Sequence, residues 1–326
     1  MKTILISGGG GYLGTYLTQV LLKKNYVVVY DEFFFKWLYK NRKKIKFNTR
    51  LKIIKKDILN VTPKDFKNVD IVCDLNGIPN DPSSELNKKY TWEINYYGRK
   101  KFAEIAKKSG VSRYIFNSTC AVYGYNKNTV NENSKTNPLS TYAKANLKAE
   151  KAIFKLKSKN FQVNILRNST LFGFSQNLRL DLVINIFVNS LINTGNITVD
   201  GDGRQWRPFI SLNDVCKIYE KIISKNSLPS FIVNLVAFNS TIKMLAFKIV
   251  KYFGKTEKNI KFISKNKDPR NYKTSSKNLK KYIGNINFTN FNYEINNLVK
   301  GIKKYKIKSN TSTIRMKFYR SRFLKK

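Results

Sequence analysis

Four consecutive glycines near the N-terminus constrain the fold of this chain more than any other feature. They follow a short β-rich run at residues 3–7 and precede residues 12–24, whose apolar side chains recur with the period of a helix. Gly8, Gly11 and Gly14 give the pattern G-x-x-G-x-x-G. Glycine allows a tight turn, lets backbone N–H groups approach a pyrophosphate, and lets the helix pack closely on the strand. A flexible turn could use the same residues, but the position between a strand and a helix favours a dinucleotide-binding loop, with the positive end of the helix dipole facing the anion.

An acidic residue at the end of the second predicted strand supports the same interpretation. Asp31 follows the apolar run at residues 26–30 and lies 17 residues after Gly14. A carboxylate at this position accepts hydrogen bonds from the adenosine ribose and repels a 2′-phosphate. The sequence therefore predicts NAD, rather than NADP, as the cofactor.

Strand-like and helix-like segments alternate through the first half of the chain. Strands are predicted at residues 3–7, 26–30, 51–56, 69–75, 111–118 and 161–170, and long helices at residues 84–109 and 140–158. This alternation is typical of right-handed βαβ units around a parallel sheet. Further helices are predicted at residues 180–194, 212–225, 241–253 and 275–283, between short strands and loops. We therefore predict an α/β fold, with a Rossmann-type doubly wound parallel sheet in residues 1–170 and a smaller C-terminal α+β substrate lobe in residues 171–326, some segments of which return to the first domain.

Composition excludes several classes of site. The chain of 326 residues has no histidine, which excludes Ser-His-Asp and Cys-His hydrolases, His-ligated zinc and haem bound through a proximal histidine. Cys73, Cys120 and Cys216 lack the spacing of metal ligands, so we expect no metal site and a reduced, intracellular protein. No apolar stretch approaches the roughly 18 residues of a membrane-spanning helix. The expected location is the cytoplasm, without a membrane partner.

The strong positive charge has two interpretations. The chain has 62 Lys and Arg against 20 Asp and Glu, a formal net charge of +42. Such a charge is typical of proteins that bind nucleic acid or an anionic membrane. A bias toward A/T-rich codons would also explain it, because Asn, Ile, Phe and Tyr are abundant and the lysines are spread along the whole chain. Only residues 36–46 and the tail at residues 315–326 are locally dense in basic and aromatic residues.

A group of residues that could perform chemistry follows the fifth predicted strand. The segment STCAVYG (residues 118–124) lies at the carboxyl edge, where open α/β sheets bind ligands, and Tyr142 begins the next long helix. A tyrosine can act as a general base if nearby positive charge lowers its pKa from about 10. Thr119 could form a hydrogen bond to the same substrate hydroxyl. On spacing alone, these residues could equally be helix caps and packing residues.

Further motifs follow in a characteristic order and spacing along nearly the whole chain. They are GGGGYLG, Asp31, Lys56-Asp57-Ile58, Asn95-Tyr96-Tyr97-Gly98, STCAVYG, the Tyr142 helix, residues 166–173, residues 201–215 and Asp268-Pro269-Arg270-Asn271-Tyr272. In combination, these segments resemble the extended short-chain dehydrogenase/reductase family, nearest to the NAD-dependent sugar-nucleotide epimerases and dehydratases of the UDP-glucose 4-epimerase type. Together these motifs are specific for the family and much less specific for one substrate.

The resemblance implies a role for each matching residue. Tyr142 would be the base, with Thr119 as its hydrogen-bonding companion and Asn146 beside them. The residues implied in cofactor binding are Gly8, Gly11, Tyr12, Leu13 and Gly14 for the pyrophosphate, Asp31 for the ribose, Asp57 and Ile58 for the adenine, and Leu75, Asn76, Gly77, Asn95, Tyr142 and Asn146 along the rest of the cofactor. Thr119 and Thr170 would contact the substrate, and Arg207 and Arg270 match arginines that grip the diphosphate through bidentate hydrogen bonds.

Two positions depart from the family pattern. The family has Tyr-x-x-x-Lys, but the fourth residue after Tyr142 is Asn146, which can form a hydrogen bond to the nicotinamide ribose but cannot supply a positive charge. Lys144, at i+2, points elsewhere on the helix. Cys120 and Ala121 stand where the 4,6-dehydratases of this type have Asp-Glu. Without that acid/base pair, we expect a redox step without elimination of water.

The resemblance implies a 4-epimerase or 4-ketoreductase that acts on a nucleotide-diphosphate sugar through a 4-keto intermediate. It also implies a homodimer formed through the two long helices. The alternative is a non-catalytic NAD-binding or RNA-associated member of the same fold, which Asn146 and the net charge of +42 motivate.

Overall fold

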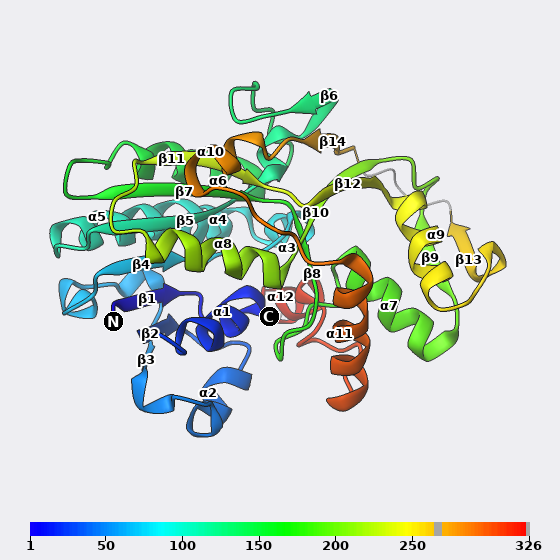
Figure 1. The fold of residues 1–326 in the computed structure, drawn as a ribbon, viewed down its shortest axis with the longest axis horizontal. Helices are drawn as coiled ribbons and strands as arrows, with labels where there is room; N and C mark the ends of the chain where they lie inside the picture. Colours follow the sequence, from blue (N-terminus) through cyan, green and yellow to red (C-terminus); the bar gives the residue numbers. More distant parts are fainter. Residues whose placement is uncertain (264–268, 324–326) are drawn as a thin grey trace.

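The computed structural model describes residues 1–263 and 269–323, and its centre is a parallel sheet of seven strands. The strand order is β11-β7-β5-β4-β1-β2-β3 (Figure 1). The bounds are β1 Thr3–Ser7, β2 Tyr26–Asp31, β3 Leu51–Lys55, β4 Ile71–Asp74, β5 Arg113–Thr119, β7 Gln162–Asn168 and β11 Phe231–Leu235. The order reverses between β1 and β4, which is the topological switch point of a doubly wound sheet. The predicted fold class is confirmed.

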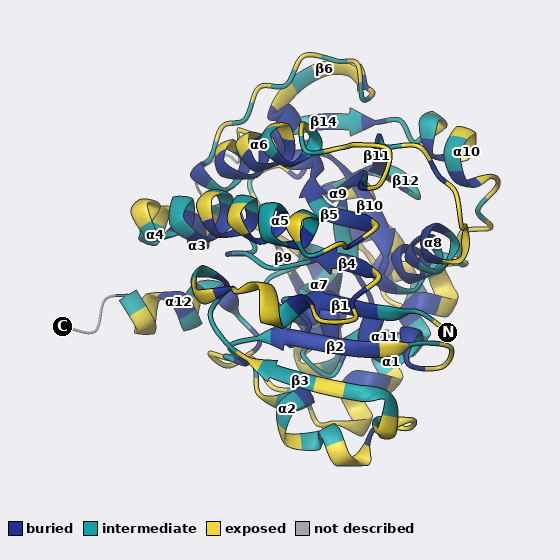
Figure 2. Ribbon diagram, turned by 90° about the vertical axis from the view of Figure 1, so that its left-hand side faces the viewer, coloured by how far each residue is buried: buried dark blue, intermediate teal, exposed yellow. Residues whose placement is uncertain are grey.

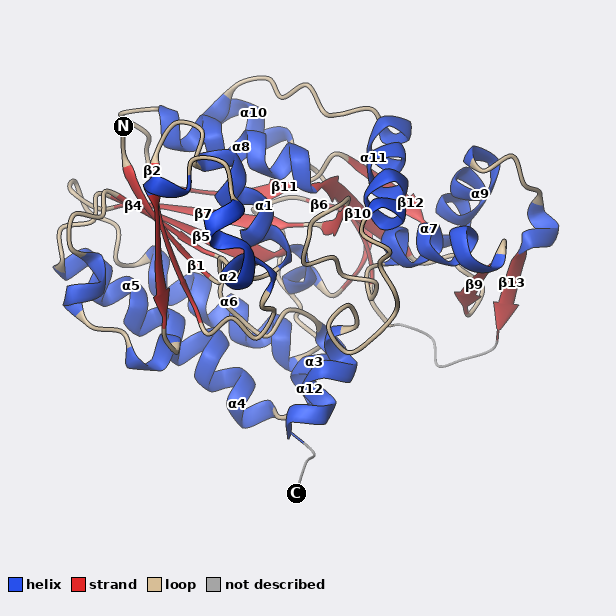
Figure 3. Cartoon of the chain, turned by 90° about the horizontal axis from the view of Figure 1, so that it is seen from below, coloured by secondary structure: helices blue, strands red, loops and turns tan. Residues whose placement is uncertain are grey.

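Helices cover both faces of this sheet (Figure 3). The helices α1 (Tyr12–Leu21) and α8 (Leu212–Ser224) lie on one face, and α5 (Arg99–Lys108) and α6 (Thr141–Phe154) lie on the other. Alternate residues of β1 divide between the two cores: Ile4 and Ile6 pack in the cluster that contains α1 and α8, and Leu5 packs in the cluster that contains α5 and α6. Because both faces are covered, the central strands are largely apolar and buried (Figure 2).

The long helix predicted at residues 84–109 is wrong as a single element. The segment consists of α3 (Asp81–Leu86), α4 (Lys88–Trp92), a π-helical turn (Glu93–Gly98) and α5. Asn87 interrupts it because its backbone is extended (φ −148°, ψ 91°) and its side chain caps α4 by accepting a hydrogen bond from Tyr90 N at 2.9 Å. The second predicted helix is observed as the shorter α6, capped by Ser140, whose Oγ accepts from Ala143 N.

The second half of the chain builds smaller sheets beside the large one. The run predicted as a single strand at residues 161–170 leaves the large sheet after β7, and β8 (Thr170–Phe172) joins β10 (Trp206–Ser211) and β12 (Phe238–Thr241). Two further pairs are β9 (Ile197–Asp200) with β13 (Ile260–Ile263), and β6 (Tyr125–Val130) with β14 (Asn271–Thr274). The remaining helices are α2 (Trp37–Asn41), α7 (Val183–Thr194), α9 (Ile242–Tyr252), α10 (Lys277–Ile283), α11 (Phe291–Lys304) and α12 (Arg315–Phe323). Strand β11 comes from the second half but forms an edge of the large sheet (Figure 1).

The C-terminal basic segment returns to the first half of the molecule. Helix α12 lies beside α3 (Figures 1 and 3). The centre of its Phe318 ring lies 5.8 Å from the centre of the Phe34 ring and 4.9 Å from the centre of the Phe35 ring. The last three residues of this segment lie outside the described residues. Within the part of the chain that is described, no helix is both long enough and apolar enough to span a membrane.

Candidate functional site

A cleft of about 980 Å³ opens at the carboxyl edge of the large sheet, between the two halves of the chain. All of the residues predicted to act in catalysis, cofactor binding or substrate binding border it. They are Gly8, Gly11, Tyr12, Leu13, Gly14, Asp31, Asp57, Ile58, Leu75, Asn76, Gly77, Asn95, Thr119, Tyr142, Asn146, Thr170, Arg207 and Arg270. The structure therefore brings the predicted site residues together, and what each one binds remains a prediction.

The glycine loop between β1 and α1 is compact enough to require glycine. Gly8 has a φ of +72°, a left-handed conformation, and a Cβ at Gly14 would lie 2.4 Å from the Gly8 carbonyl oxygen and 2.6 Å from Gly9 Cα. No side chain caps the first turn of α1, and that turn contains no acidic residue. The loop thus leaves backbone N–H groups at the start of α1 facing the cleft, as a dinucleotide pyrophosphate requires.

Asp31 is fixed at the end of β2 by the loop it faces. Its Oδ2 accepts from Gly10 N at 3.0 Å, and its other carboxylate oxygen accepts from Phe33 N. Burial raises the pKa of Asp31 to about 6, against the lowering effect of these two hydrogen bonds and of Arg315. Asp57 caps the short turn after β3 by accepting from Leu59 N at 2.9 Å.

Tyr142 and Thr119 meet at the far end of the cleft from Asp31. Thr119 is the last residue of β5, and its Oγ1 accepts from Ala121 N at 3.1 Å. Tyr142 lies in the first turn of α6, where its N–H donates to Ser84 Oγ at 3.0 Å. The pKa of Tyr142 is raised from its ordinary value, because burial outweighs the lowering effects of the hydrogen bond with Thr119 and of the charges of Arg179 and Arg99. Asp81 raises that pKa further.

Asn95 does not point freely into the cleft. Its Oδ1 accepts from Ile78 N at 2.7 Å, and its Nδ2 donates to the Ile78 carbonyl at 3.0 Å. The amide of Asn95 therefore holds the loop that follows β4, which includes Gly77. A role for Asn95 in cofactor binding would be indirect, through the position of this loop.

The predicted substrate arginines lie together where the second half of the chain closes over the cleft. Arg207 Nη1 donates to the Arg270 carbonyl at 2.6 Å, and the guanidinium carbon of Arg207 lies 5.8 Å from the centre of the Tyr272 ring. Arg270 forms an ion pair with Asp81 of α3. Asp268, part of the same motif, lies outside the described residues.

The Cys120-Ala121 position offers no acid/base pair. Cys120 is completely buried, its Sγ donates to the Arg167 carbonyl at 3.1 Å, and burial raises the pKa of its thiol. Ala121 presents only a methyl group to the cleft. Among the described residues there is also no group of three or more His, Cys, Asp or Glu that could hold a metal ion.

Sequence reasoning missed several charged residues that line the cleft, among them Arg99, Arg179, Asp181 and Arg315. Arg179 forms a bidentate ion pair with Asp181, in which Nε donates to Oδ1 at 3.0 Å and Nη2 donates to Oδ2 at 3.1 Å. Arg315 of α12 is only 2% exposed, and its guanidinium carbon lies 3.4 Å from the centre of the Phe35 ring. Burial lowers the pKa of Arg315 to about 9. Nothing local in the sequence distinguishes the three arginines from the many surface cations.

The comparisons with known proteins agree with this geometry. The model of the NAD dependent epimerase/dehydratase family matches residues 4–235. The chain belongs to this family. Membership confirms the predicted family resemblance and NAD as the cofactor of the family.

Sequence relatives and solved structures resemble this chain at low sequence identity. An uncharacterized UDP-glucose epimerase from Bacillus subtilis is 29% identical over 241 residues, which cover 71% of this chain and 76% of the relative. The UDP-glucuronic acid 4-epimerase from Bacillus cereus, solved with UDP-glucuronic acid and NAD, superposes with a TM-score of 0.82 at 23% identity, covering 93% of this chain and 99% of its own. The UDP-N-acetylglucosamine 4-epimerase from Methanobrevibacter ruminantium gives a TM-score of 0.83 at 22% identity, with the same coverage.

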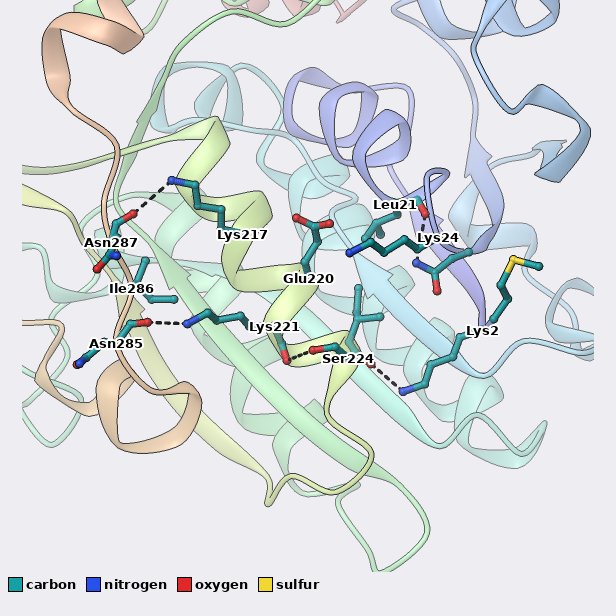
Figure 4. A pocket seen from close by; sticks show the side chains of 13 residues that line it. Lys2, Leu21, Lys24, Lys217, Glu220, Lys221, Ser224, Asn285, Ile286 and Asn287 are labelled. Carbon is teal, nitrogen blue, oxygen red and sulfur yellow. Dashed lines mark hydrogen bonds between the residues drawn. The ribbon is translucent and has the colours of Figure 1, made fainter.

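A second hollow, of about 690 Å³, lies at the opposite edge of the sheet and is lined by lysines (Figure 4). Three of them donate to backbone carbonyls: Lys2 to Ile223 at 2.7 Å, Lys217 to Asn287 at 3.3 Å and Lys221 to Asn285 at 2.5 Å. These lysines join α8 to the segments around it. Their arrangement has a structural explanation and does not resemble the converging groups of the cleft.

Proposed function

We propose that this protein is a sugar-nucleotide 4-epimerase or 4-ketoreductase that acts through a 4-keto sugar. The observation that carries the proposal is the position of Tyr142 and Thr119 in one continuous cleft with the glycine loop and with Arg207 and Arg270. A bound dinucleotide and a bound nucleotide sugar can therefore lie end to end, from the glycine loop past Tyr142 to the two arginines. Such positioning supplies much of the catalysis in a site of this kind.

The cofactor half of the cleft fits NAD. The space beside Gly14, which a Cβ would fill, lets the helix start close to the loop, and Asp31 lies where ribose hydroxyls can donate to it. Bound NAD supplies a nicotinamide that accepts a hydride and returns it. The glycine loop would hold the pyrophosphate through the N–H groups of the first turn of α1, which begins at Tyr12, because the N–H groups of Gly8 and Gly11 donate within the protein. Asp57 and Ile58 would hold the adenine, and Tyr142 and Asn146 the nicotinamide ribose.

In the substrate half, Tyr142 would take the proton of the sugar C4 hydroxyl, and Thr119 would form a hydrogen bond to the same oxygen. Thr170 would contact the sugar nucleotide. Arg207 and Arg270 would bind the diphosphate, where a fork-shaped guanidinium meets two phosphate oxygens. An epimerase returns the hydride to the other face of the 4-keto sugar, whereas a reductase performs the step once.

The elimination of water is not part of this proposal. Cys120 is buried with its thiol bonded to a carbonyl, and Ala121 has no titratable group. A dehydratase needs an acid and a base at the sugar, and neither residue can act as one at neutral pH. The solved 4-epimerases with the same fold make an epimerase the first activity to test.

The experiment is to denature the purified protein and identify the released small molecules by mass spectrometry. Retained NAD, especially with a nucleotide sugar, would support a redox-neutral epimerase and would name the substrate class. RNA without a dinucleotide would contradict the proposal and favour the RNA-associated alternative. If no small molecule is released, adding NADH with 4-keto nucleotide sugars tests the ketoreductase, and no oxidation of NADH would then exclude it.

We also propose the division predicted from the sequence, with a cofactor domain in residues 1–170 and a sugar-nucleotide lobe in residues 171–326. A homodimer that contacts through the α3–α5 region and α6 is proposed as well. Sedimentation velocity at several protein concentrations would test the dimer, and a monomer at all of them would contradict it.

A further inference from the structure

Arg99 is a buried cation at the floor of the cleft. It begins α5 and is only 2% exposed. Its Nε donates to Asp74 Oδ2 at 2.9 Å, and its Nη2 donates to the carbonyls of Asp74 and Asn117, both at 3.0 Å. Its Nη1 donates to Asn146 Oδ1 at 2.8 Å. The guanidinium carbon also lies 3.8 Å from the centre of the Phe116 ring, so every side of the group is held.

The partner carboxylate is equally constrained. Asp74 is completely buried at the end of β4, and its Oδ1 accepts from Ser7 Oγ at 2.7 Å. Its Oδ2 accepts from Tyr114 Oη at 2.8 Å in addition to Arg99. A buried ion pair carries a large desolvation cost, so its presence alone is weak support for a stabilising role. Its position next to the cleft suggests that the charge is there for another reason.

Asn146 links this cation to Tyr142. The Asn146 Nδ2 donates to the Tyr142 backbone carbonyl at 2.8 Å, while its Oδ1 accepts from Arg99. Asn146 is 2% exposed and borders the cleft together with Arg99 and Tyr142. A lysine at position 146 would place an ammonium against the guanidinium, because both are donors without an acceptor. A cation at 99 and a cation at 146 therefore exclude each other in this packing.

We propose that Arg99, from α5, supplies the positive charge that α6 lacks at position 146. Asn146 would hold this guanidinium in a fixed position relative to Tyr142. The inference rests on the proposed function, because it assigns Arg99 as a positioning residue for the base Tyr142. Asp74 balances the charge of Arg99 from the side of the sheet, and the Nη1 end of the guanidinium faces α6.

The charges around Tyr142 agree with this assignment. Arg99 and Arg179 favour the phenolate and lower the pKa of Tyr142, whereas Asp81 and burial raise it. Asp81 is paired with Arg270, and Arg179 is paired with Asp181. Without Arg99, the pKa of Tyr142 would rise further, because burial and Asp81 would be opposed by one fewer positive charge.

The test is the titration of Tyr142 in NAD-loaded protein, taken as the ultraviolet difference between each protein and the same protein with Tyr142→Phe. The main variant is Arg99→Gln with Asp74→Asn, which removes both charges so that no carboxylate is left unpaired. Arg99→Lys is the conservative control, and Asn146→Lys alone and with Arg99→Gln moves the cation between the two helices. NAD content and circular dichroism check that each protein is folded.

With Arg99 and Asp74 neutralised, we expect the Tyr142 titration to move up by about one pH unit, with about a tenfold loss of sugar turnover at neutral pH. Arg99→Lys should retain most of the activity. Asn146→Lys alone should not increase turnover, whereas Arg99→Gln with Asn146→Lys should recover part of it. An unchanged Tyr142 titration after neutralisation, or a gain of activity from Asn146→Lys alone, would overturn the inference.

The two hypotheses fail in different ways. A shifted Tyr142 titration in a protein that turns over no nucleotide sugar would retain the inference about Arg99 and reject the proposed function. Normal turnover with an unshifted titration would do the reverse.

Discussion

The two ends of the cleft are built by different kinds of interaction. At the cofactor end, the loop from Gly8 to Gly14 is held by its backbone geometry, and Asp31 is held by backbone N–H groups of that loop and of Phe33. At the catalytic end, Tyr142 depends on side chains from β5, α5, α3 and the segment before α7. The first end is therefore encoded locally, whereas the second depends on where the fold places charges from distant segments.

The largest expected effect concerns the local end. Gly14→Ala would place a Cβ 2.4 Å from the Gly8 carbonyl oxygen, so the loop must move away from α1. We expect NAD affinity to fall by at least about 100-fold, since the loop and the start of the helix would no longer face one anion together. Isothermal titration calorimetry with NAD measures this effect.

Gly11→Ala is the matched control in the same loop. Its Cβ would lie 3.2 Å from the same oxygen at a φ of −77°, which alanine can adopt. We expect a loss of less than about tenfold. Equal losses in the two variants would show that the loop is not limited by this contact.

The pH dependence of NAD binding tests whether Asp31 acts as a carboxylate. Its pKa is raised to about 6, so the ionised form is lost as the pH falls through that value. We expect NAD affinity to drop about tenfold between pH 7 and pH 5, because only the carboxylate accepts fully from the ribose hydroxyls. Asp31→Asn should bind more weakly and without this pH dependence; a pH dependence that survives in the variant would assign it to another group.

The raised pKa of Asp31 has the opposite consequence for the folding stability of the NAD-free protein, which we expect to be greater at low pH. Because the folded state holds the proton of Asp31 more tightly than the unfolded chain does, Asp31 contributes stability at low pH that is lost as the pH rises through about 6. Urea denaturation of the wild type and of Asp31→Asn at pH 5 and pH 7 would reveal this difference.

The smallest expected effect concerns Arg315, which is far from the glycine loop in the sequence. If Arg315 contributes to NAD binding, the cofactor end of the cleft is not encoded by local segments alone. Arg315 of α12 is buried against Phe35 and faces the cleft. We expect Arg315→Met to weaken NAD binding by about three- to tenfold, a typical loss for one charge-assisted contact. Arg320→Met, on an exposed position of the same helix, is the control; if both variants bind NAD equally, α12 does not take part.

The features that arise from local patterns along the chain could be predicted from the sequence. The apolar strands, the glycine loop and the position of Asp31 follow from local patterns, and the family motifs place the cleft residues in one order. The break at Asn87 was missed because helical spacing continues across it, while the side chain of Asn87 caps a new helix. The exit of β8 into another sheet was missed because only Ser169 separates β7 from β8, and no glycine or proline marks the point where the chain leaves the large sheet.

The charges at the catalytic end could not be predicted in the same way. Among 62 basic residues, Arg99 has no local feature that separates it from a surface cation. Its partners Asp74 and Asn146 lie 25 and 47 residues away, so only the packed fold brings the three together. The asparagine at position 146 was identified as a missing charge, but the cation that faces it comes from another helix.

If Tyr142 is a working base in this cleft, the NAD-loaded protein should turn over a nucleotide sugar in a reaction that requires the phenol. Wild type and Tyr142→Phe would be incubated with a panel of UDP- and dTDP-sugars, and the C4 epimers followed by nuclear magnetic resonance. We predict that the wild type forms an epimer and that Tyr142→Phe loses at least about 100-fold in rate, a typical contribution of a positioned general base, with unchanged NAD content. Equal rates in the two proteins, or no turnover of any sugar by NAD-loaded wild type, would contradict the claim.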